Sequence, residues 1–315
     1  MGDPTNRILL TGGSGFIGGH LCAALQRAGH TPVVLDLLKP ATPGVEFHRG
    51  DVSDLDGRHA ALLDDVRAIY HLAWTTKPQS ATDAPVADAQ SNLIVGLRLL
   101  DALARRTNAP RLIFMSSGGA IYGETAAESI SEDHPTFPLN AYGVSKLAFE
   151  HYLRLYHHIH GLDYLVFRPS NPYGERQDPN GSQGAVAVFL GHIARGDAIT
   201  IWGDGSVIRD YLYVGDLADA LVCALGYMPG AGPRVFNVGS GRGVSLRELI
   251  KAIEHLTGRS SRVTFTEGRK TDAPRVVLDV TRMAHTMGWK PATSLDAGIA
   301  RTWKWVEANI QPSST

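Results

Sequence analysis

A glycine-rich segment near the N-terminus constrains the fold more than any other feature of this chain. The segment Thr11–Gly18 reads TGGSGFIG, and it joins the apolar run Ile8–Thr11 to the helical pattern Phe16–Ala28. Glycines permit a sharp turn and let the backbone approach a ligand closely, because no Cβ intervenes. The helix that follows presents unpaired N–H groups, which suit phosphate. The segment therefore predicts a strand–turn–helix unit that binds a dinucleotide.

The same alternation of strand and helix patterns continues through the first half of the chain. Strands are expected at Ile8–Thr11, Thr31–Asp36, Val45–Arg49, Ala68–His71, Arg111–Ser116 and Asp163–Arg168, and helices at Phe16–Ala28, Ala87–Arg105 and Tyr142–His158. Strands separated by helices pair in parallel, with right-handed crossovers. We expect an α/β fold with a Rossmann-type doubly wound parallel sheet.

The sequence pattern changes after about Pro169. A loop rich in proline and glycine begins there, and shorter segments with mixed strand and helix patterns follow it. We expect residues 1–168 to form an NAD-binding Rossmann domain, joined by a later strand near 234–238. Residues 169–315 are expected to form mainly a smaller mixed α/β lobe that binds substrate.

Composition excludes several classes of function. The 30 basic and 31 acidic residues nearly cancel, which gives no electrostatic footprint for nucleic acid or an anionic membrane. Two distant cysteines argue against a disulfide framework, and no segment has the length of a membrane span or the apolar core of a signal peptide. We expect a cytoplasmic enzyme without nucleic-acid or membrane partners.

The end of the second expected strand indicates which dinucleotide is bound. Asp36 lies there, where a carboxylate accepts hydrogen bonds from both adenosine ribose hydroxyls and repels a 2′-phosphate. NAD is therefore favoured over NADP, although Lys39 lies nearby. The alternative is that Asp36 only caps a loop.

A tyrosine and a lysine one helical turn apart form the candidate catalytic pair. Tyr142 and Lys146 share one face of the expected helix. A free tyrosine has a pKa of about 10 and is a poor base at neutral pH. A nearby ammonium favours the phenolate and lowers that pKa. The alternative is a Tyr and a Lys that simply face solvent, and the spacing alone does not decide.

Together these segments resemble the extended short-chain dehydrogenase/reductase family, particularly its NAD-dependent nucleotide-sugar 4-epimerases. The matching segments are Thr11–Gly18, Asp51-Val52, His71-Leu72-Ala73, Asn92, Ser116–Gly123, Tyr142–Lys146, Arg168–Gly174, Arg209–Asp216 and Gly288–Pro291. The resemblance implies epimerisation at C4 of a nucleotide sugar, UDP-glucose/UDP-galactose or the N-acetyl forms, through a transient 4-keto sugar. It also implies a homodimer through the helices Ala87–Arg105 and Tyr142–His158.

The resemblance also implies a set of contacts to NAD. Lys146 is expected to bind the nicotinamide ribose, Asp51 and Val52 to lie beside the adenine, and Pro172 and Tyr173 to lie against the nicotinamide. The full set of expected cofactor residues is Gly12, Gly15, Phe16, Ile17, Gly18, Asp36, Asp51, Val52, Leu72, Ala73, Asn92, Ser116, Tyr142, Lys146, Pro172 and Tyr173.

One position departs from the epimerase pattern. The family carries a Ser or Thr that hydrogen-bonds the sugar 4-oxygen, and Gly118 stands there in this chain. Either Ser117 replaces it, or water does, or Tyr142 works without help. Ser117 could instead only hydrogen-bond backbone at the end of a strand. The adjoining Gly-Gly-Ala offers no acid or base, so it speaks against a 4,6-dehydratase.

In the second half, the resemblance implies further contacts to the substrate. Asn171 is expected at the phosphate region, and Arg209 and Arg269 at the pyrophosphate, since guanidinium groups donate paired hydrogen bonds to phosphate. Each arginine alone could instead form a surface salt bridge. Val276 matches a position that limits the sugar pocket, and its small size suggests room for an N-acetyl group.

Two other functions stay open on the sequence. A keto-sugar reductase, or an epimerase of a dTDP- or GDP-sugar, would use Tyr142 and Lys146 equally well. A non-catalytic NAD sensor is a further alternative, which Gly118 alone favours. No histidine has the context of a metal ligand, and we expect no metal.

Overall fold

The structure is a computed structural model that describes residues 6–268 and 273–310. The chain divides into two compact units. The first unit comprises Met1–Gly123, Pro135–Arg168 and Ala218–Phe236, and the second comprises Glu124–His134, Pro169–Leu217 and Asn237–Thr315. That one part binds the cofactor and the other the substrate stays a prediction.

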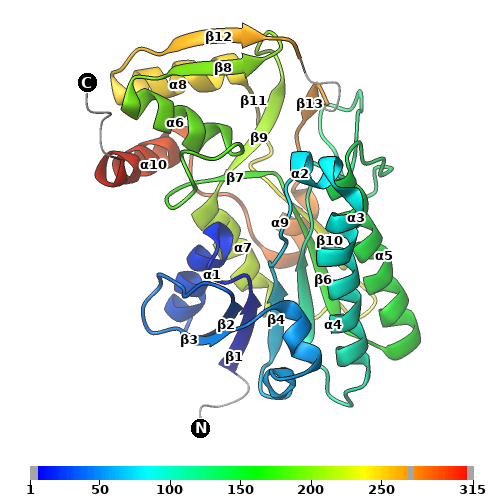
Figure 1. The fold of residues 1–315 in the computed structure, drawn as a ribbon. Coiled ribbons are helices and arrows are strands. Elements are labelled where there is room, and N and C mark those ends of the chain that lie inside the picture. The colour runs from blue at the N-terminus through cyan, green and yellow to red at the C-terminus, as the bar shows by residue number, and fades with distance from the viewer. Residues whose placement is uncertain (1–5, 269–272, 311–315) are drawn as a thin grey trace. The chain divides into compact units, whose positions relative to one another are not determined.

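A seven-stranded sheet forms the centre of the first unit (Figure 1). Its strands are β1 (Arg7–Thr11), β2 (Thr31–Asp36), β3 (Glu46–Arg49), β4 (Ala68–His71), β5 (Arg111–Met115), β6 (Tyr164–Pro169) and β10 (Val235–Val238). Their order is β10-β6-β5-β4-β1-β2-β3, and the pairings from β3 to β6 are parallel. The order reverses between β1 and β4, where doubly wound sheets bind their ligands. The predicted fold class is confirmed.

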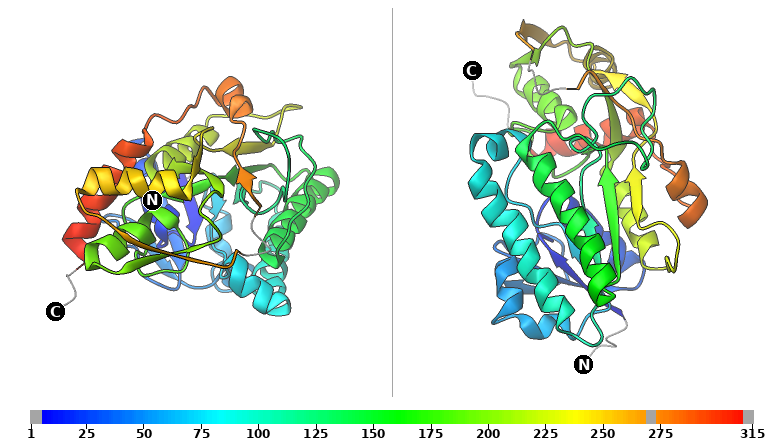
Figure 2. Two further views of the ribbon diagram at one scale, coloured as in Figure 1. Left: turned by 90° about the horizontal axis from the view of Figure 1, so that it is seen from above. Right: turned by 90° about the vertical axis from the view of Figure 1, so that its right-hand side faces the viewer.

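Helices cover both faces of this sheet. The helical elements are α1 (Phe16–Arg27), the short turns Val52–Asp56 and Ala60–Leu63, α2 (Pro78–Asp83), α3 (Pro85–Asp88), a π-helical turn (Ala89–Ile94), α4 (Val95–Ala104), α5 (Ala141–His160) and α7 (Val214–Ala224). Figure 2 shows α4 and α5 side by side. On the other face, Arg27 of α1 lies 3.6 Å from Asp219 of α7.

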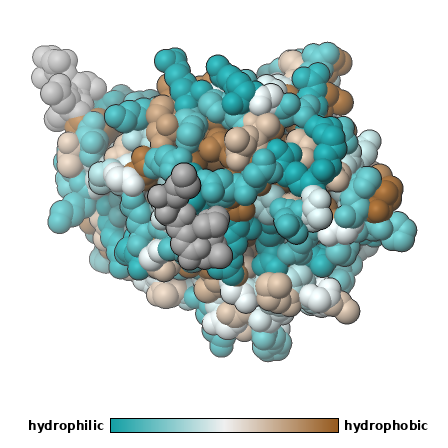
Figure 3. All heavy atoms as spheres, turned by 90° about the horizontal axis from the view of Figure 1, so that it is seen from below, coloured by the Kyte–Doolittle hydropathy of each residue, from teal (hydrophilic) through white to brown (hydrophobic). Residues whose placement is uncertain are grey.

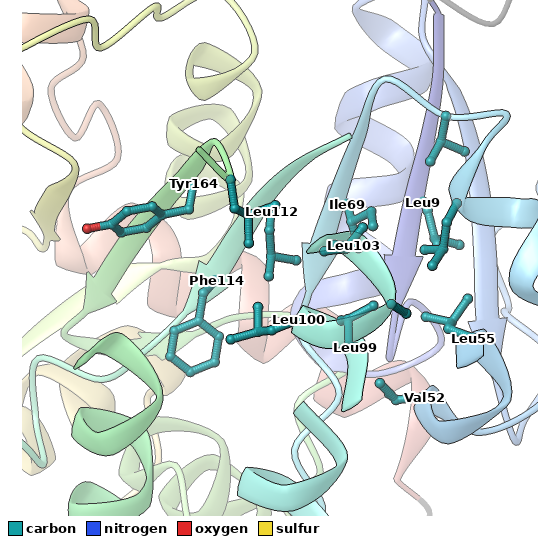
Figure 4. Close-up of a cluster of buried hydrophobic side chains, with 14 of the residues drawn as sticks. Leu9, Val52, Leu55, Ile69, Leu99, Leu100, Leu103, Leu112, Phe114 and Tyr164 are labelled. Atoms are coloured by element: carbon teal, nitrogen blue, oxygen red, sulfur yellow. The ribbon is translucent and has the colours of Figure 1, made fainter. Parts of the chain in front are cut away.

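Alternate strand residues point to opposite faces, as the two-residue period of a strand requires. Leu9 and Ile69 pack against Leu99 and Leu100 of α4 in the buried cluster of Figure 4. The next residue, Tyr70, points the other way, and its hydroxyl donates to the carbonyl of Leu221 in α7 at 2.6 Å. Burial on both faces explains why these strands are almost continuously apolar.

The helix expected at Ala87–Arg105 is interrupted. The structure has α3, then the π-helical turn Ala89–Ile94, then α4. Inside this stretch Asn92 Nδ2 donates to Asp88 Oδ1 at 2.9 Å, and Asn92 Oδ1 accepts from the backbone N–H of Thr75 at 2.8 Å. These polar contacts hold the wide turn against the loop after β4. π-Helical turns of this kind are frequent at functional sites.

The second unit contains smaller sheets and four helices of its own among the described residues. Its strands are β7 (Asn171–Tyr173), β8 (Ala198–Trp202), β9 (Ile208–Tyr213), β11 (Gly243–Ser245), β12 (Arg262–Thr266) and β13 (Arg275–Val276), and its helices are α6 (Ala185–Arg195), α8 (Leu246–Thr257), α9 (Thr281–Met287) and α10 (Leu295–Asn309). β9 pairs with β7, β11 and β13, and β8 pairs with β12.

The surface is mixed in character. On the face drawn in Figure 3, hydrophilic side chains predominate and hydrophobic ones are scattered among them. Among the described residues, no helix combines the length and the apolar composition that crossing a membrane requires.

Candidate active site

The glycine-rich turn has the geometry that its sequence predicts. Gly12 has a φ of +74°, and a Cβ on it would lie 2.7 Å from the backbone nitrogen of Ala73. A Cβ on Gly18 would lie 2.5 Å from the Gly12 oxygen, so both positions require glycine. Gly15 is the N-cap of α1 and provides no side-chain cap.

The first turn of α1 has N–H groups available for an anion. The first backbone bond of the helix runs from Gly19 N–H to Gly15 O at 2.9 Å. The helix itself therefore offers no acceptor to the N–H groups of Phe16, Ile17 and Gly18. This arrangement fits the phosphates of a dinucleotide.

Asp36, at the end of β2, accepts two backbone hydrogen bonds. Ser14 N–H donates to its Oδ2 at 3.0 Å and Leu38 N–H to its Oδ1 at 3.1 Å. The loop-capping role and the ribose-binding role are thus compatible, because each carboxylate oxygen keeps a further lone pair. Asp51 caps the short turn after β3 through Ser53, and the side chain of Val52 is buried in the core.

The candidate catalytic residues lie in the first two turns of α5. Asn140 begins this helix by accepting a hydrogen bond from Gly143 N–H at 2.9 Å. A Cβ on Gly143 would lie 2.3 Å from the Ala120 oxygen, so the helix start packs directly on the segment after β5. The nitrogen of Lys146 lies 5.6 Å from the centre of the Tyr142 ring. The structure therefore brings the predicted pair together.

Lys146 is almost completely buried. Its ammonium donates to the Met115 carbonyl at the end of β5 at 2.6 Å, and it lies 3.9 Å from the centre of the Trp74 ring. It also lies 4.7 Å from the centre of the Phe114 ring. Aromatic faces attract a cation, and they replace part of the water that burial removes.

Burial dominates the electrostatics of the pair. It lowers the pKa of Lys146 well below its ordinary value, against the attraction of Glu150 and Asp88. Burial and, second, the negative charge of Asp88 raise the pKa of Tyr142. The sequence predicts a lowered pKa for Tyr142 from the ammonium alone, because it does not reveal burial or Asp88.

The segment after β5 carries the residues expected at the sugar. Ser116 is buried and its hydroxyl donates to Glu150, which forms an ion pair with Arg168 at 2.6 Å. Ser117 is partly exposed, and its hydroxyl has no hydrogen-bond partner among the described residues. Gly118 is buried beside it. Ser117 is therefore the hydroxyl of this segment that remains available to a ligand.

Two residues of the site were missed by the sequence interpretation. Asp88 is fully buried and accepts hydrogen bonds from Asn92, Thr76 and Ser145, and Trp74 covers the ammonium of Lys146. The four-residue spacing of Asp88 and Asn92 on one helical stretch was the available signal for Asp88. Nothing in the sequence marks Trp74, since its contact arises from the tertiary fold.

The expected residues after β4 lie next to these groups. Leu72 N–H donates to the Thr11 oxygen at 3.1 Å, which places Leu72 and Ala73 at the ends of β1 and β4, beside the glycine-rich turn. Asn92 is buried and tied to Thr75 in the same loop. Cofactor binding by these residues stays a prediction.

Gly118 belongs to the first unit, whereas the other expected substrate residues fall in the second unit. Asn171 pairs with Tyr211, and Val276 pairs with Arg209, so both pairs are organised by β9. Asn171 Nδ2 donates to the Asp210 oxygen at 3.1 Å, and Arg209 donates to the Ala273 oxygen at 2.7 Å.

The remaining expected residues of the second half are Pro172, Tyr173 and Arg269. Tyr173 is 1% exposed and its hydroxyl donates to the Leu295 oxygen at 3.2 Å, and its expected contact with the nicotinamide stays a prediction. Pro172 precedes it in β7 and is partly exposed. Arg269 lies outside the described residues.

Comparison with known proteins identifies the family of this chain. Residues 8–239 match the model of the NAD dependent epimerase/dehydratase family. A UDP-glucose 4-epimerase of Mycolicibacterium smegmatis is 38% identical over 308 residues, which cover 94% of this chain and 97% of the relative.

Solved structures give the same result. The UDP-glucose 4-epimerase of Thermotoga maritima, determined with UDP-glucose, has a TM-score of 0.89 at 33% identity and covers 97% of this chain and 100% of that one. The enzyme of Thermus thermophilus, determined with NAD, has a TM-score of 0.87 at 36% identity over 96% of this chain and 100% of that one. The resemblance drawn from the sequence is confirmed: the chain belongs to the NAD-dependent epimerase/dehydratase family.

Proposed function

We propose that this chain is an NAD-dependent epimerase that inverts C4 of a UDP-sugar, with Tyr142 and Lys146 as its catalytic residues. The observation that carries the proposal is the pairing of these two side chains on α5, with the Lys146 nitrogen 5.6 Å from the centre of the Tyr142 ring. Family membership and the UDP-sugar neighbours support the reaction.

The residues of the first unit fit NAD. The open first turn of α1 suits the pyrophosphate, and Asp36 suits the ribose hydroxyls of NAD rather than a 2′-phosphate. When bound, NAD supplies a reversible acceptor for the hydrogen on C4 of the sugar.

Each candidate catalytic residue has a distinct task. Tyr142 takes the proton of the sugar 4-hydroxyl and later returns it, as a general base and then a general acid. Lys146, while charged, favours the phenolate of Tyr142. Ser117 is the candidate hydrogen-bond donor to the sugar 4-oxygen, in place of the side chain that Gly118 lacks.

Product analysis tests this proposal. The protein is incubated with UDP-glucose, UDP-galactose and their N-acetylated forms, and products are followed by proton NMR. We expect each 4-epimer to appear without added reduced cofactor, because an epimerase returns the hydrogen that it removes. Turnover that requires added NADH or NADPH would instead favour the keto-sugar reductase, and NAD binding without any turnover would favour the sensor.

The sugar pocket is expected to admit an N-acetyl group. Val276 is a small side chain beside Arg209 in the β9–β13 pairing. If it limits the pocket, UDP-N-acetylgalactosamine and UDP-galactose should both turn over. A strict preference for UDP-galactose would contradict this assignment of Val276.

A homodimer through α5 is the assembly that the surface favours. Val144, Leu155 and Ile159 are exposed at 53%, 45% and 60%, and their spacing places them on one face of the helix. A second copy of this chain would bury that face. Light scattering should give twice the chain mass, and Leu155→Glu should shift the protein to the monomer; a monomeric parent protein would refute the dimer. A cytoplasmic location stays a prediction from the sequence.

A further inference from the structure

Asp88, at the end of α3, is fully buried beside the candidate catalytic pair. Its Oδ1 accepts hydrogen bonds from Thr76 in the loop after β4 and from Asn92, at 2.9 Å. Its Oδ2 accepts a hydrogen bond from the hydroxyl of Ser145 in α5. In all three contacts the carboxylate is the acceptor, which is the role that its ionised form has.

Buried charges need compensation, and the charges at this site are compensated unequally. Glu150 is matched by Arg168, whose Nη2 lies 2.6 Å from its carboxylate. Within residues 6–268 and 273–310, neither Asp88 nor Lys146 forms a salt bridge with a group of opposite charge. Asp88 and Lys146 are therefore the buried anion and the buried cation left to balance each other through space.

Two carboxylates, Glu150 first and Asp88 second, attract the ammonium of Lys146. Glu150 attracts Lys146 along the same helix, but its charge is shared with Arg168. From β4, His71 faces the ammonium as a neutral ring, because burial and then the charge of Lys146 itself lower its pKa to about 3. Tyr142 lies on the α5 turn before Lys146 and is neutral before it loses its proton.

Ser145 also connects Asp88 to the helix that carries the catalytic pair, through a hydrogen bond. It lies directly before Lys146, and its hydroxyl ties α5 to α3 through Asp88. Thr76 and Asn92 tie the same carboxylate to the loop after β4, which carries Trp74 over the ammonium. One carboxylate thus joins three segments that surround Lys146.

We propose that Asp88 is a positioning residue for the catalytic pair: its charge keeps the buried Lys146 ammonium protonated, and its bond to Ser145 fixes the first turns of α5. This inference rests on the proposed roles of Tyr142 and Lys146. Its two parts predict different consequences for two variants. Asp88→Asn removes the charge, and Ser145→Ala removes the bond while the charge stays.

The test follows the charge of Lys146 directly, without turnover. The whole protein is labelled with lysine carrying ¹³C at Cε, and its NMR spectrum is recorded over a range of pH. Lys146→Met identifies the resonance by its loss. We expect Lys146 to be protonated at pH 7 in the parent protein and to titrate about one pH unit lower in Asp88→Asn. In Ser145→Ala the midpoint should stay near that of the parent.

A kinetic measurement complements the titration. Asp88→Asn should lower kcat by up to about tenfold at pH values above the new Lys146 midpoint, with little change in KM, and activity should recover as the pH is lowered toward that midpoint. An unchanged Lys146 midpoint in Asp88→Asn would overturn the inference. A Lys146 that is already neutral at pH 7 in the parent protein would overturn it without any variant. Because the titration needs no substrate, these results stand apart from a failure of epimerisation.

Discussion

The ammonium of Lys146 lies 3.9 Å from the centre of the Trp74 indole ring, and Lys146 is buried in the first unit. This contact matters because burial otherwise disfavours the charged form of Lys146. An indole face that meets a desolvated cation stabilises it by about 2 kcal/mol, and one pKa unit corresponds to about 1.4 kcal/mol. Trp74 is thus positioned to preserve the charge on which the activation of Tyr142 depends.

Replacement of Trp74 should therefore lower the pKa of Lys146. Trp74→Leu is expected to lower it by about one unit and to reduce kcat by up to about tenfold at pH values above the new Lys146 midpoint. Trp74→Phe keeps an aromatic face, so both the fall in the pKa of Lys146 and the loss of kcat should be smaller. The measurement is the dependence of kcat on pH for the parent and both variants. Equal losses in the leucine and phenylalanine variants would show that the ring face has no part in the effect.

The sequence predicted those features that depend on residues close together along the chain. The glycine-rich turn, the parallel sheet and the spacing of Tyr142 and Lys146 all follow from local geometry, and the structure contains each of them. Asp88 was missed because a carboxylate in a polar, helical-looking stretch normally faces solvent.

Features that arise from the tertiary fold could not be predicted in this way. The burial of Tyr173 is one such feature, because Leu295 and Gly298, far along the chain, enclose its ring. The raised pKa of Tyr142 likewise depends on burial and on Asp88, which is distant in sequence. A sequence pattern contains no information about which distant residues will enclose a side chain.

Removal of the Tyr142 hydroxyl should abolish most of the activity and leave the fold intact. General acid–base participation is worth about 10²–10⁴ in rate, so we expect a loss of kcat in that range for Tyr142→Phe. NAD affinity should change little. Tyr152→Phe is the matched control, because this tyrosine lies on the same helix but is 37% exposed. Near-normal turnover in Tyr142→Phe would remove it from the mechanism.

The glycine-rich turn can be tested with a matched pair of alanine variants. Gly12 and Gly29 both have positive φ values, of +74° and +82°. A Cβ at Gly29 meets nothing within 4 Å, so Gly29→Ala should cost about 1 kcal/mol in the free energy of unfolding from backbone strain alone.

At Gly12 the same change adds a clash with Ala73, which should cost about 1–3 kcal/mol more. It should also weaken NAD binding. The measurements are urea unfolding and calorimetric titration with NAD. Equal unfolding free energies for Gly12→Ala and Gly29→Ala would argue against the close approach of the turn to Ala73.

His71 should make the protein less stable in mild acid. Burial, with a smaller contribution from Lys146, lowers the pKa of His71 to about 3 in the folded protein. Its pKa in the unfolded chain is about 6.5. As the pH falls below that value, His71 takes up a proton in the unfolded chain but stays neutral in the folded protein. The contribution of the neutral His71 to the free energy of unfolding is therefore fully present above about pH 6.5, and it is lost as the pH falls toward 3.

The variant His71→Leu should remove this dependence. Between about pH 5.5 and about pH 4, its free energy of unfolding should fall less steeply than that of the parent, by up to about 1.4 kcal/mol per pH unit. Urea unfolding at a series of pH values measures both slopes. Parallel slopes would mean that His71 takes up its proton in the folded state as well.

Adjacent serines after β5 allow the last prediction to separate stability from activity. Ser116 donates to the buried carboxylate of Glu150, whereas the hydroxyl of Ser117 has no partner among the described residues. Ser116→Ala should therefore lower the free energy of unfolding by about 1.5–3 kcal/mol, the usual worth of a hydrogen bond to a charged group. Ser117→Ala should leave stability unchanged and lower kcat about tenfold, since a lost donor to the sugar 4-oxygen raises the barrier by about 1.4 kcal/mol. Full activity in Ser117→Ala would show that the Ser117 hydroxyl is not the donor to the sugar 4-oxygen, and that either water takes its place or Tyr142 works without help.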